Sequence, residues 1–268
     1  KGKCMQRLEG HQHFVQGVCI DPKFKYIITQ SSDRTVRVWK KAKSKKMVQF
    51  YHEGTIKKMD YPTKPEIKDK PSENRVSDKI EEEDNKSAVN QSFTSFRVFL
   101  DDATMQVFFR RMDWSPDGSL LLLPAAQYKK SPDTPATAVV YAYRRGDLST
   151  PCLMIPTNNK PALCVRFCPV IFKKDPEGPN TVQIFDLPYK MIYAVATTDS
   201  VLVYSTQCLL PIIIIANITG NIHYASITDM SWNSSKLLGI SSSDGFCSFM
   251  RFESSELGQE LPKEEMDA

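Results

Sequence analysis

The chain has 268 residues, of which 41% are hydrophobic and 25% are charged, and its formal net charge is +4. This is the composition of an ordinary globular protein with a substantial core, and the small positive excess does not by itself indicate nucleic-acid binding. The apolar run 209–216 is far shorter than the roughly 20 residues of a transmembrane helix and contains Pro211, so we expect a buried strand there.

A repeat phrase begins at Gly10 and ends at Trp39. It consists of an apolar strand, a polar turn, a second apolar strand, then small residues and an aspartate-led hairpin, with β-branched and aromatic residues in each apolar run. The phrase is close to a complete WD repeat. His11, Ser31, Asp33 and Trp39 stand where WD repeats commonly build a buried hydrogen-bonded tetrad, which stabilises a blade only if every polar member has a partner.

A polar segment, 54–92, interrupts the chain after the first repeat. It contains the acidic run 81–84 and very few apolar residues, so we expect a disordered or loosely attached insertion between blades. The basic run 40–46 lies just before it. That run is a nuclear-import signal, a phosphate contact or a solvated turn between strands, the last being the more common case.

Three further copies of the phrase follow, at 112–143, 165–204 and 230–250. In the second copy a Tyr replaces the terminal Trp. Because these copies lack the His and the Trp of the first phrase, we expect their blades to rely on apolar packing. His223 and Tyr224 lie in the loop before the last copy, and we expect His223 to close that blade through a Ser or an Asp rather than to serve a functional role.

The repeats predict an all-β fold, a WD-repeat β-propeller. A single four-stranded sheet of this kind cannot bury both faces, so the copies must stack around an axis. About four blades fit within residues 1–253, with 3–8 as an outer strand of a preceding blade, and a polar tail follows at 254–268. Since WD-repeat propellers usually have about seven blades, we expect the C-terminal part of a seven-bladed propeller, with a closed four-bladed ring as the alternative.

The cysteines and the known catalytic motifs give no sign of a metal, a cofactor or an enzyme. Cys19, Cys164, Cys168 and Cys247 lie within strand phrases, and we expect buried reduced thiols in a cytosolic or nuclear compartment. Cys164 and Cys168 lack the second ligand pair of a zinc site. The sequence also contains no P-loop, nucleophile elbow, zinc-protease motif or glycine-rich fingerprint, so we expect a non-catalytic protein without a cofactor.

Several strings go beyond the generic repeat, namely Phe108-Phe109-Arg110-Arg111, 115–122, 187–190, 194–196, 199–202, 221–224, 244–249 and 256–258. Through these strings the chain resembles the middle, WD-repeat subunit of chromatin assembly factor one. The resemblance covers nearly all of the chain except the insertion. The first string and the string 244–249 (Asp-Gly-Phe-Cys-Ser-Phe) are specific, because a generic blade needs neither.

The resemblance implies a nuclear, non-catalytic scaffold in a histone chaperone that assembles nucleosomes on replicating or repaired DNA. It implies as partners the large and small subunits of chromatin assembly factor one, and core histones through the complex. An anti-silencing histone chaperone would join them only if the full protein has a C-terminal tail. We expect neither membrane binding nor sequence-specific DNA binding. The alternative is a WD-repeat adaptor of another complex, either the replication-independent histone deposition subunit or a ubiquitin-ligase substrate receptor.

The candidate partner-binding residues are Phe108, Phe109, Arg110 and Arg111, which lie just before a blade strand. In one interpretation the two arginines face outward and pair with acidic groups of the large subunit, since guanidinium groups match carboxylates in a bidentate geometry. In the other, the two phenylalanines pack in the core or between blades and the arginine stems cover apolar surface. We expect Tyr189 to pack between blades with its hydroxyl at the rim.

Overall fold

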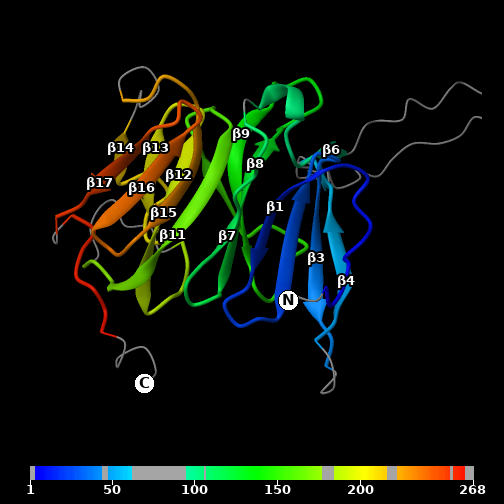
Figure 1. The fold of residues 1–268 in the computed structure, drawn as a ribbon, viewed down its shortest axis with the longest axis horizontal. Coiled ribbons are helices and arrows are strands. Elements are labelled where there is room, and N and C mark those ends of the chain that lie inside the picture. Colours follow the sequence, from blue (N-terminus) through cyan, green and yellow to red (C-terminus); the bar gives the residue numbers. More distant parts are fainter. Residues whose placement is uncertain are drawn as a thin grey trace, which may run out of the picture.

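The computed structural model describes residues 4–43, 48–61, 95–105, 107–176, 184–215, 222–253 and 256–262. Within these ranges the chain forms antiparallel sheets and one short 3-10 helix, η1 (Asp102–Thr104). Figure 1 shows the sheets side by side in chain order, with the first (blue) and the last (orange to red) at opposite ends of the row. The prediction of an all-β fold built from propeller blades is confirmed.

Four sheets correspond to the four repeat phrases, and in each of them strands that are consecutive in the chain are neighbours. Blade 1 contains β1 (Val15–Ile20), β2 (Tyr26–Ser31), β3 (Thr35–Lys41) and β4 (Phe50–Ile56). Blade 2 contains β7 (Asp113–Trp114), β8 (Leu120–Tyr128), β9 (Thr137–Arg144) and β10 (Leu153–Pro156). Blade 3 contains β11 (Ala162–Lys173), β12 (Tyr189–Thr197), β13 (Val201–Ser205) and β14 (Ile213–Ile215). Blade 4 contains β15 (Ile227–Trp232), β16 (Leu237–Ser242) and β17 (Cys247–Arg251).

Aspartates and glycines end the apolar runs by forming the hairpin turns. After β1, the carboxylate of Asp21 accepts hydrogen bonds from the backbone N–H groups of Lys23 at 3.1 Å and Lys25 at 2.9 Å. In the turn between β7 and β8, Gly118 adopts a φ of 70°, a conformation that glycine reaches without the steric cost of a side chain. The repeat phrase therefore encodes its turns as well as its strands.

The innermost strands β1, β7, β11 and β15 follow one another from blade to blade. The residues before β7 extend it between its neighbours. The N–H of Arg110 donates to the carbonyl of Gln16 on β1 at 3.0 Å, and Arg111 forms a parallel bridge with Cys164 on β11. The segment 110–111 thus connects three blades through its backbone.

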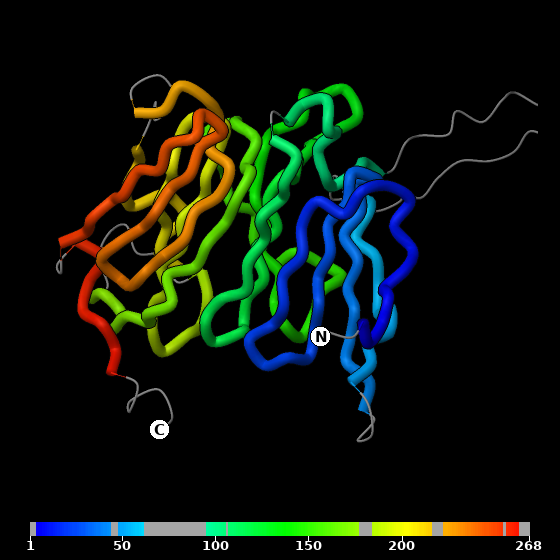
Figure 2. Tube along the Cα trace, viewed as in Figure 1, coloured from blue at the N-terminus to red at the C-terminus, as the bar shows by residue number. Residues whose placement is uncertain are grey.

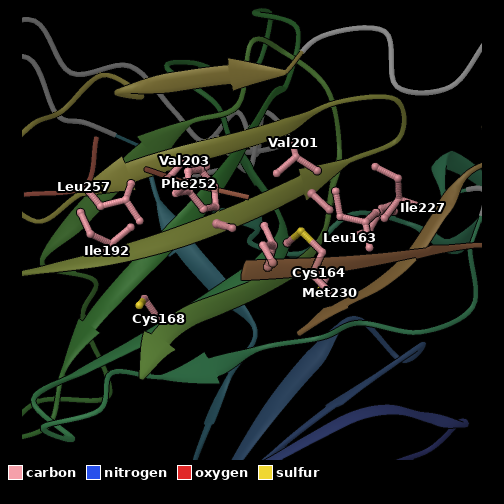
Figure 3. Packing of buried hydrophobic residues seen from close by; sticks show 14 of the residues in the cluster. Leu163, Cys164, Cys168, Ile192, Val201, Val203, Ile227, Met230, Phe252 and Leu257 are labelled. Carbon is pink, nitrogen blue, oxygen red and sulfur yellow. The ribbon is translucent and has the colours of Figure 1, made fainter. Parts of the chain in front are cut away.

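Three apolar clusters fill the spaces between successive blades. Figure 3 shows the cluster between blades 3 and 4, where Leu163 of β11 lies near Ile227 and Met230 of β15. Cys164 and Cys168 belong to this cluster, are fully buried and are free thiols. Burial raises the pKa of Cys168 to about 11 and raises that of Cys164 further. Both thiols are therefore protonated packing residues at neutral pH.

Two of the strand cysteines differ from the expectation of burial. Cys19 is partly exposed and Cys247 is exposed. Cys247 begins β17, whose side chains alternate between exposed and half-buried positions along the outer part of blade 4. The apolar run at 209–216 differs in the same way. Among its described residues only 213–215 form a strand, the short outer strand β14, in which Ile214 is 52% exposed, and Leu210 before the strand is 71% exposed.

The predicted insertion 54–92 begins later than expected. Residues 54–56 complete β4, and β5 (Lys58–Asp60) pairs with β6 (Ser95–Arg97). Residues 62–94, the larger part of this prediction, lie outside the described residues, and so do residues 44–47 of the basic run.

Residues 4–8 lie along blade 1 itself, instead of forming a separate strand of a preceding blade. The side-chain amide of Gln6 donates to the carbonyl of Phe50 at 2.6 Å and accepts from its N–H at 2.8 Å. Figure 2 shows this stretch in dark blue beside β4. These side-chain hydrogen bonds connect the stretch to the outer strand β4, in place of the backbone hydrogen bonds by which a β-strand would pair with it.

The segment after β17 stays on the blades, where the sequence predicts a polar tail from 254. Leu257 is 3% exposed and packs in the cluster between blades 3 and 4. The N–H of Leu261 donates to the carbonyl of Ile171 on β11 at 2.8 Å. These two leucines hold an otherwise polar segment against blade 3, so the change of composition at 254 does not mark the end of the packed structure. Residues 254–255 and 263–268 lie outside the described part of the chain.

Candidate partner-binding surface

The hydrogen-bonded network of blade 1 centres on Thr29. Its hydroxyl lies 2.8 Å from Nε2 of His11 and accepts a hydrogen bond from the indole N–H of Trp39 at 2.9 Å. Nδ1 of His11 lies 3.0 Å from Oδ2 of Asp33. The structure brings these three expected residues together, but Ser31 instead accepts the backbone N–H of Asp33 at 3.1 Å. Thr29 and Ser31 are two residues apart on β2 and share a face, so the alternation of the strand could not distinguish them.

The carboxylate of Asp33 is held in its ionised form. Burial raises its pKa, but hydrogen bonds from the hydroxyl of Thr35 at 2.6 Å and the N–H of Gln12 at 3.0 Å, together with His11, outweigh burial and lower the pKa to about 2. The ionised group joins the start of blade 1 to its second hairpin. Its role is structural.

Blade 4 contains a second network of the same kind. Nδ1 of His223 lies 3.1 Å from Oδ2 of Asp244, and its Nε2 lies 3.0 Å from the hydroxyl of Ser248. The sequence comparison of the phrases missed this histidine as a blade member because it precedes the phrase, but the expectation of a blade-closing His223 agrees with these contacts. Tyr224 beside it donates its backbone N–H to Asp244, while 86% of its side chain is exposed.

The arrangement of Ser248, His223 and Asp244 has the hydrogen-bond order of a catalytic triad. The chemistry of a triad requires a histidine that a substrate can reach, whereas His223 is 1% exposed. The same order recurs in blade 1, where the hydroxyl of Thr29 is occupied by Trp39. Its recurrence in two blades, both times buried, identifies the arrangement as a structural support of the fold.

Other polar contacts connect one blade with the next. The hydroxyl of Tyr189, at the start of β12, donates to Oδ2 of Asp117 in blade 2 at 2.8 Å. Arg145 of blade 2 forms an ion pair with Asp21 of blade 1 and also donates to the carbonyl of Gly118 at 2.8 Å. Because the side chain of Asp21 is fully buried, this pair fixes the contact between blades 1 and 2.

Arg110 does not face outward. It is 3% exposed, and Nη1 donates to the carbonyls of Phe108 at 3.1 Å and Phe109 at 3.2 Å, and also to that of Val107. Nη2 donates to the carboxylate of Asp102 at 3.0 Å. The guanidinium group therefore folds the preceding loop around itself, and its charge is satisfied within the chain.

Arg111 is also paired within the chain. Its Nε lies 3.3 Å from the carboxylate of Asp229 on β15, which also accepts a hydrogen bond from Arg166 of β11 at 2.8 Å. The guanidinium carbon lies 4.2 Å from the ring centre of Phe109. Asp229 thus joins two arginines at the inner edge of blades 2, 3 and 4. The geometry does not support the interpretation that these arginines are the groups that bind an acidic partner.

The phenylalanines of the same segment are the exposed part. Phe108 is 47% exposed and Phe109 is 43% exposed, so they are not core residues either. Their rings meet edge to face at 5.3 Å, and Phe108 meets Phe14 at 6.2 Å. Phe14, just before β1, is 73% exposed. We call Phe14, Phe108 and Phe109 the aromatic ledge.

An exposed aromatic cluster of this kind is typical of protein-binding surfaces. Large rings expose much apolar area to water, so covering them with a partner gives a large favourable free energy. Sequence reasoning selected Phe108 and Phe109 but missed Phe14. The available signal was an aromatic residue immediately before an inner strand, yet its contact with a segment far along the chain depends on the three-dimensional arrangement.

The described residues contain no group of three or more His, Cys, Asp or Glu side chains that could hold a metal ion. No helix in that part of the chain is long and apolar enough to cross a membrane.

The sequence matches two family models. One, described as the CAF1B/HIR1 beta-propeller domain, matches residues 64–257, and the other, described as the WD domain, G-beta repeat, matches residues 2–40. The larger match includes two of the three residues of the aromatic ledge.

Curated relatives align with almost the whole chain. The chromatin assembly factor 1 subunit FAS2 homolog of Oryza sativa subsp. japonica is 40% identical over 96% of this chain and 46% of its own length. A Mus musculus protein, also named as a subunit of chromatin assembly factor 1, is 38% identical over 96% of this chain and 40% of its own length. Protein HIR1 of Kluyveromyces lactis is 27% identical over 97% of this chain and 25% of its own length. The chain therefore spans less than half the length of these relatives.

Proposed function

The chain belongs to the CAF1B/HIR1 β-propeller family, and on this basis we propose that it acts as a non-catalytic scaffold of a histone chaperone that assembles nucleosomes on replicating or repaired DNA. Its partners are the large and small subunits of chromatin assembly factor one, with core histones reached through the complex. The place of action is the nucleus.

The observation that carries the proposal is the gap in identity between two groups of relatives. Proteins named as chromatin assembly factor 1 subunits are 40% and 38% identical to the chain, whereas the HIR1 protein is 27% identical over a similar span. Since all three align with 96% or 97% of the chain, coverage does not explain the difference. Replication-independent histone deposition is the second candidate, supported by the shared family model.

The structure supports a binding role through the aromatic ledge. Phe108 and Phe109 directly precede residues 110–111, whose backbone is hydrogen-bonded to blades 1 and 3. Aromatic anchors have few rotatable bonds and lose little conformational entropy when a partner covers them, and they commonly dominate the energetics of protein interfaces. We propose that the large subunit is the partner that covers the ledge.

The experiment that tests this function is affinity purification of the intact, tagged protein from nuclear extract, followed by mass spectrometry. An unrelated WD-repeat propeller with the same tag serves as the control. We expect recovery of the large and small subunits of chromatin assembly factor one and of core histones. Recovery of a replication-independent deposition complex, or of a ubiquitin-ligase adaptor, without the large subunit would contradict the proposal.

A further inference from the structure

A polar pocket of about 540 Å³ opens next to the aromatic ledge. It lies where the loop before β1, the β2–β3 turn, the end of β4 and strand β6 come together, and four positively charged side chains line it. We call it the cationic pocket. Its positively charged residues are Arg34, Arg37, Lys57 and Arg97.

The positive charges of the pocket are only partly compensated. Asp33 and Asp101 are the carboxylates at the pocket; Asp33 is committed to the blade 1 network, and Asp101 lies 3.4 Å from Arg34. Within the described ranges, Arg37, Lys57 and Arg97 have no carboxylate within ion-pair distance.

Two of the three guanidinium groups, those of Arg37 and Arg97, are also short of hydrogen-bond acceptors, whereas Nε of Arg34 donates to the carbonyl of Phe99 at 2.9 Å. Nη1 of Arg97 reaches the carbonyl of Asp33 only at 3.5 Å. In the same part of the structure the buried Nε of Arg37 has no acceptor. Burial lowers the pKa of Arg34, and the nearby charge of Arg97 lowers it further against the opposing effect of Asp101. Like charges held together in a recess repel one another, and an anion that enters would relieve this repulsion.

The cationic pocket and the aromatic ledge are neighbours at the start of blade 1. Ser32, which lines the pocket, donates its backbone N–H to the carbonyl of Phe14 at 3.0 Å, and His13, which also lines it, directly precedes Phe14 in the chain. A protein segment that enters the pocket therefore has an aromatic ring of the ledge next to it.

We propose that the cationic pocket binds the carboxylates of an acidic protein segment whose neighbouring apolar side chains pack on the aromatic ledge. This inference rests on the proposed function and specifies the chemistry of the segment that the partner supplies. Arginine groups match carboxylates through paired, charge-assisted hydrogen bonds. Here the available arginines are Arg37 and Arg97, because Arg34, like Arg110 and Arg111, already has partners within the chain.

An acidic protein segment fits the surface better than nucleic acid. Nucleic-acid binding sites follow the phosphate backbone as a basic stripe and usually occur on strongly basic domains. Here the charges gather in one recess, the whole chain has a net charge of only +4, and the adjoining aromatic rings suit apolar side chains. DNA binding is accordingly one of the outcomes that the test distinguishes.

The test measures binding of a short fluorescein-labelled peptide, with alternating Glu and Leu residues followed by Phe, to the intact protein by fluorescence anisotropy. We expect saturable binding that weakens as salt is added, because part of the attraction is between charges. The matched peptide with Gln in place of every Glu should bind at least about tenfold more weakly, since it loses the charge-assisted hydrogen bonds. A labelled DNA duplex should bind more weakly than the acidic peptide.

Three variants locate the site. Lys57→Glu and Arg97→Gln should each weaken binding of the acidic peptide by about tenfold. Lys58→Glu is the matched control, because the neighbouring Lys58 lines a different groove and the change in charge equals that of Lys57→Glu. Lys57 is exposed, so its substitution leaves the fold intact, and an unchanged thermal unfolding midpoint verifies this.

Three results would overturn the inference. The first is equal binding of the Glu and Gln peptides, and the second is equal weakening by Lys57→Glu and Lys58→Glu, which would indicate a general charge effect. The third is tighter binding of the DNA duplex than of the acidic peptide, with the DNA binding lost in the same pocket variants, which would assign the pocket to phosphate groups. The peptide measurement requires no chaperone subunit, so it can fail while the large subunit still co-purifies, and the two proposals are judged separately.

Discussion

At the scale of single residues, one hydroxyl group decides how blade 1 is held together. Thr29 is the only hydroxyl in the described network that contacts both His11 and Trp39. The repeat phrase predicted three of the four members of the network. It named Ser31 in place of Thr29 because both side chains lie on the same face of β2, and only their distances to the ring atoms distinguish them.

Replacing Thr29 by Val should lower the free energy of unfolding by about 2–3 kcal/mol, because the buried ring nitrogens of His11 and Trp39 would each lose a partner. The matched variant Ser31→Ala removes a hydroxyl that accepts from the N–H of Asp33 and donates to the carbonyl of His13 at 3.3 Å, and it should cost about 1 kcal/mol. Urea denaturation of both variants checks the order. A larger loss in Ser31→Ala would show that the hydroxyl nearer the turn is the central member.

Asp33 should make part of the stability depend on pH. Its folded-state pKa of about 2 lies below the ordinary value of 3.8, so its stabilising contribution is present above the unfolded pKa and is lost as the pH falls through about 2. We expect a contribution of about 2 kcal/mol at neutral pH that decreases from about pH 5 downward. The difference in unfolding free energy between the wild type and Asp33→Asn, measured from pH 7 to pH 3, gives this dependence. A difference that stays constant over that range would contradict it.

At the scale of elements, the segment before β7 explains why the aromatic ledge exists. Its backbone is fixed between β1 and β11, and Arg110 occupies the interior, so the two phenylalanines are displaced to the surface. Sequence patterning predicts the reverse, because phenylalanine is usually buried and arginine exposed. The carbonyl groups of a tight loop made burial of the arginine favourable, and no pattern of side chains reveals where such carbonyls will point.

Gly17 on β1 provides a test of this close approach. A Cβ atom at Gly17 would lie 1.9 Å from the carbonyl oxygen of Arg110, so Gly17→Ala must separate the inner strands. We expect a loss of more than about 3 kcal/mol in unfolding free energy together with weaker binding to the ledge.

Gly54→Ala is the matched control in the same blade, because a Cβ atom there meets no other atom within 4 Å. Thermal and urea denaturation should show little change in this variant. Similar losses in the two variants would mean that the backbone preference of glycine, and not the contact with Arg110, is responsible.

Element boundaries were less predictable than the elements themselves. The phrases located the first three strands of all four blades, since β-branched runs ending in Asp, Pro or Gly are a strong local signal. They ended before the outer strands β4 and β10, and the predicted insertion included the last residues of β4. The signal misses the segment 256–262, where Leu257 and Leu261 stand in a polar stretch and pack through long-range contacts with blade 3. For β14 the signal predicts too much burial, because its isoleucines suggest a core strand but lie at the outer edge of blade 3.

At the scale of the whole molecule, blades 1 and 4 form the two ends of an open row (Figure 1). Apolar side chains are exposed at both ends, with Val18 64% and Ile20 53% exposed on β1, and Phe249 72% exposed on β17. A propeller closes such faces by adding blades. If the intact protein has about seven blades, as the repeats predict, the additional blades should cover these exposed residues.

Hydroxyl-radical footprinting of the intact protein tests whether these residues are covered. Closure of the ring should protect Ile20 and Phe249, which belong to opposite ends of the row, while Tyr224, 86% exposed on a loop, stays reactive. Strong labelling of both end residues would contradict closure by further blades.

We propose that this propeller holds the large chaperone subunit through its aromatic ledge. The most direct test is co-purification of the large subunit with the Phe108→Ser, Phe109→Ser double variant, compared with Phe24→Ser. Phe24 is as exposed as Phe109, at 43%, but lies at the opposite end of β1 from Phe14, which makes it a suitable control.

We predict that the double variant keeps its fold, as judged by circular dichroism, while its affinity for the large subunit falls about thirtyfold or more, the effect of removing an interface hot spot of about 2 kcal/mol. The Phe24→Ser control should bind like the wild type. Undiminished co-purification of the large subunit with the folded double variant would contradict binding through the aromatic ledge.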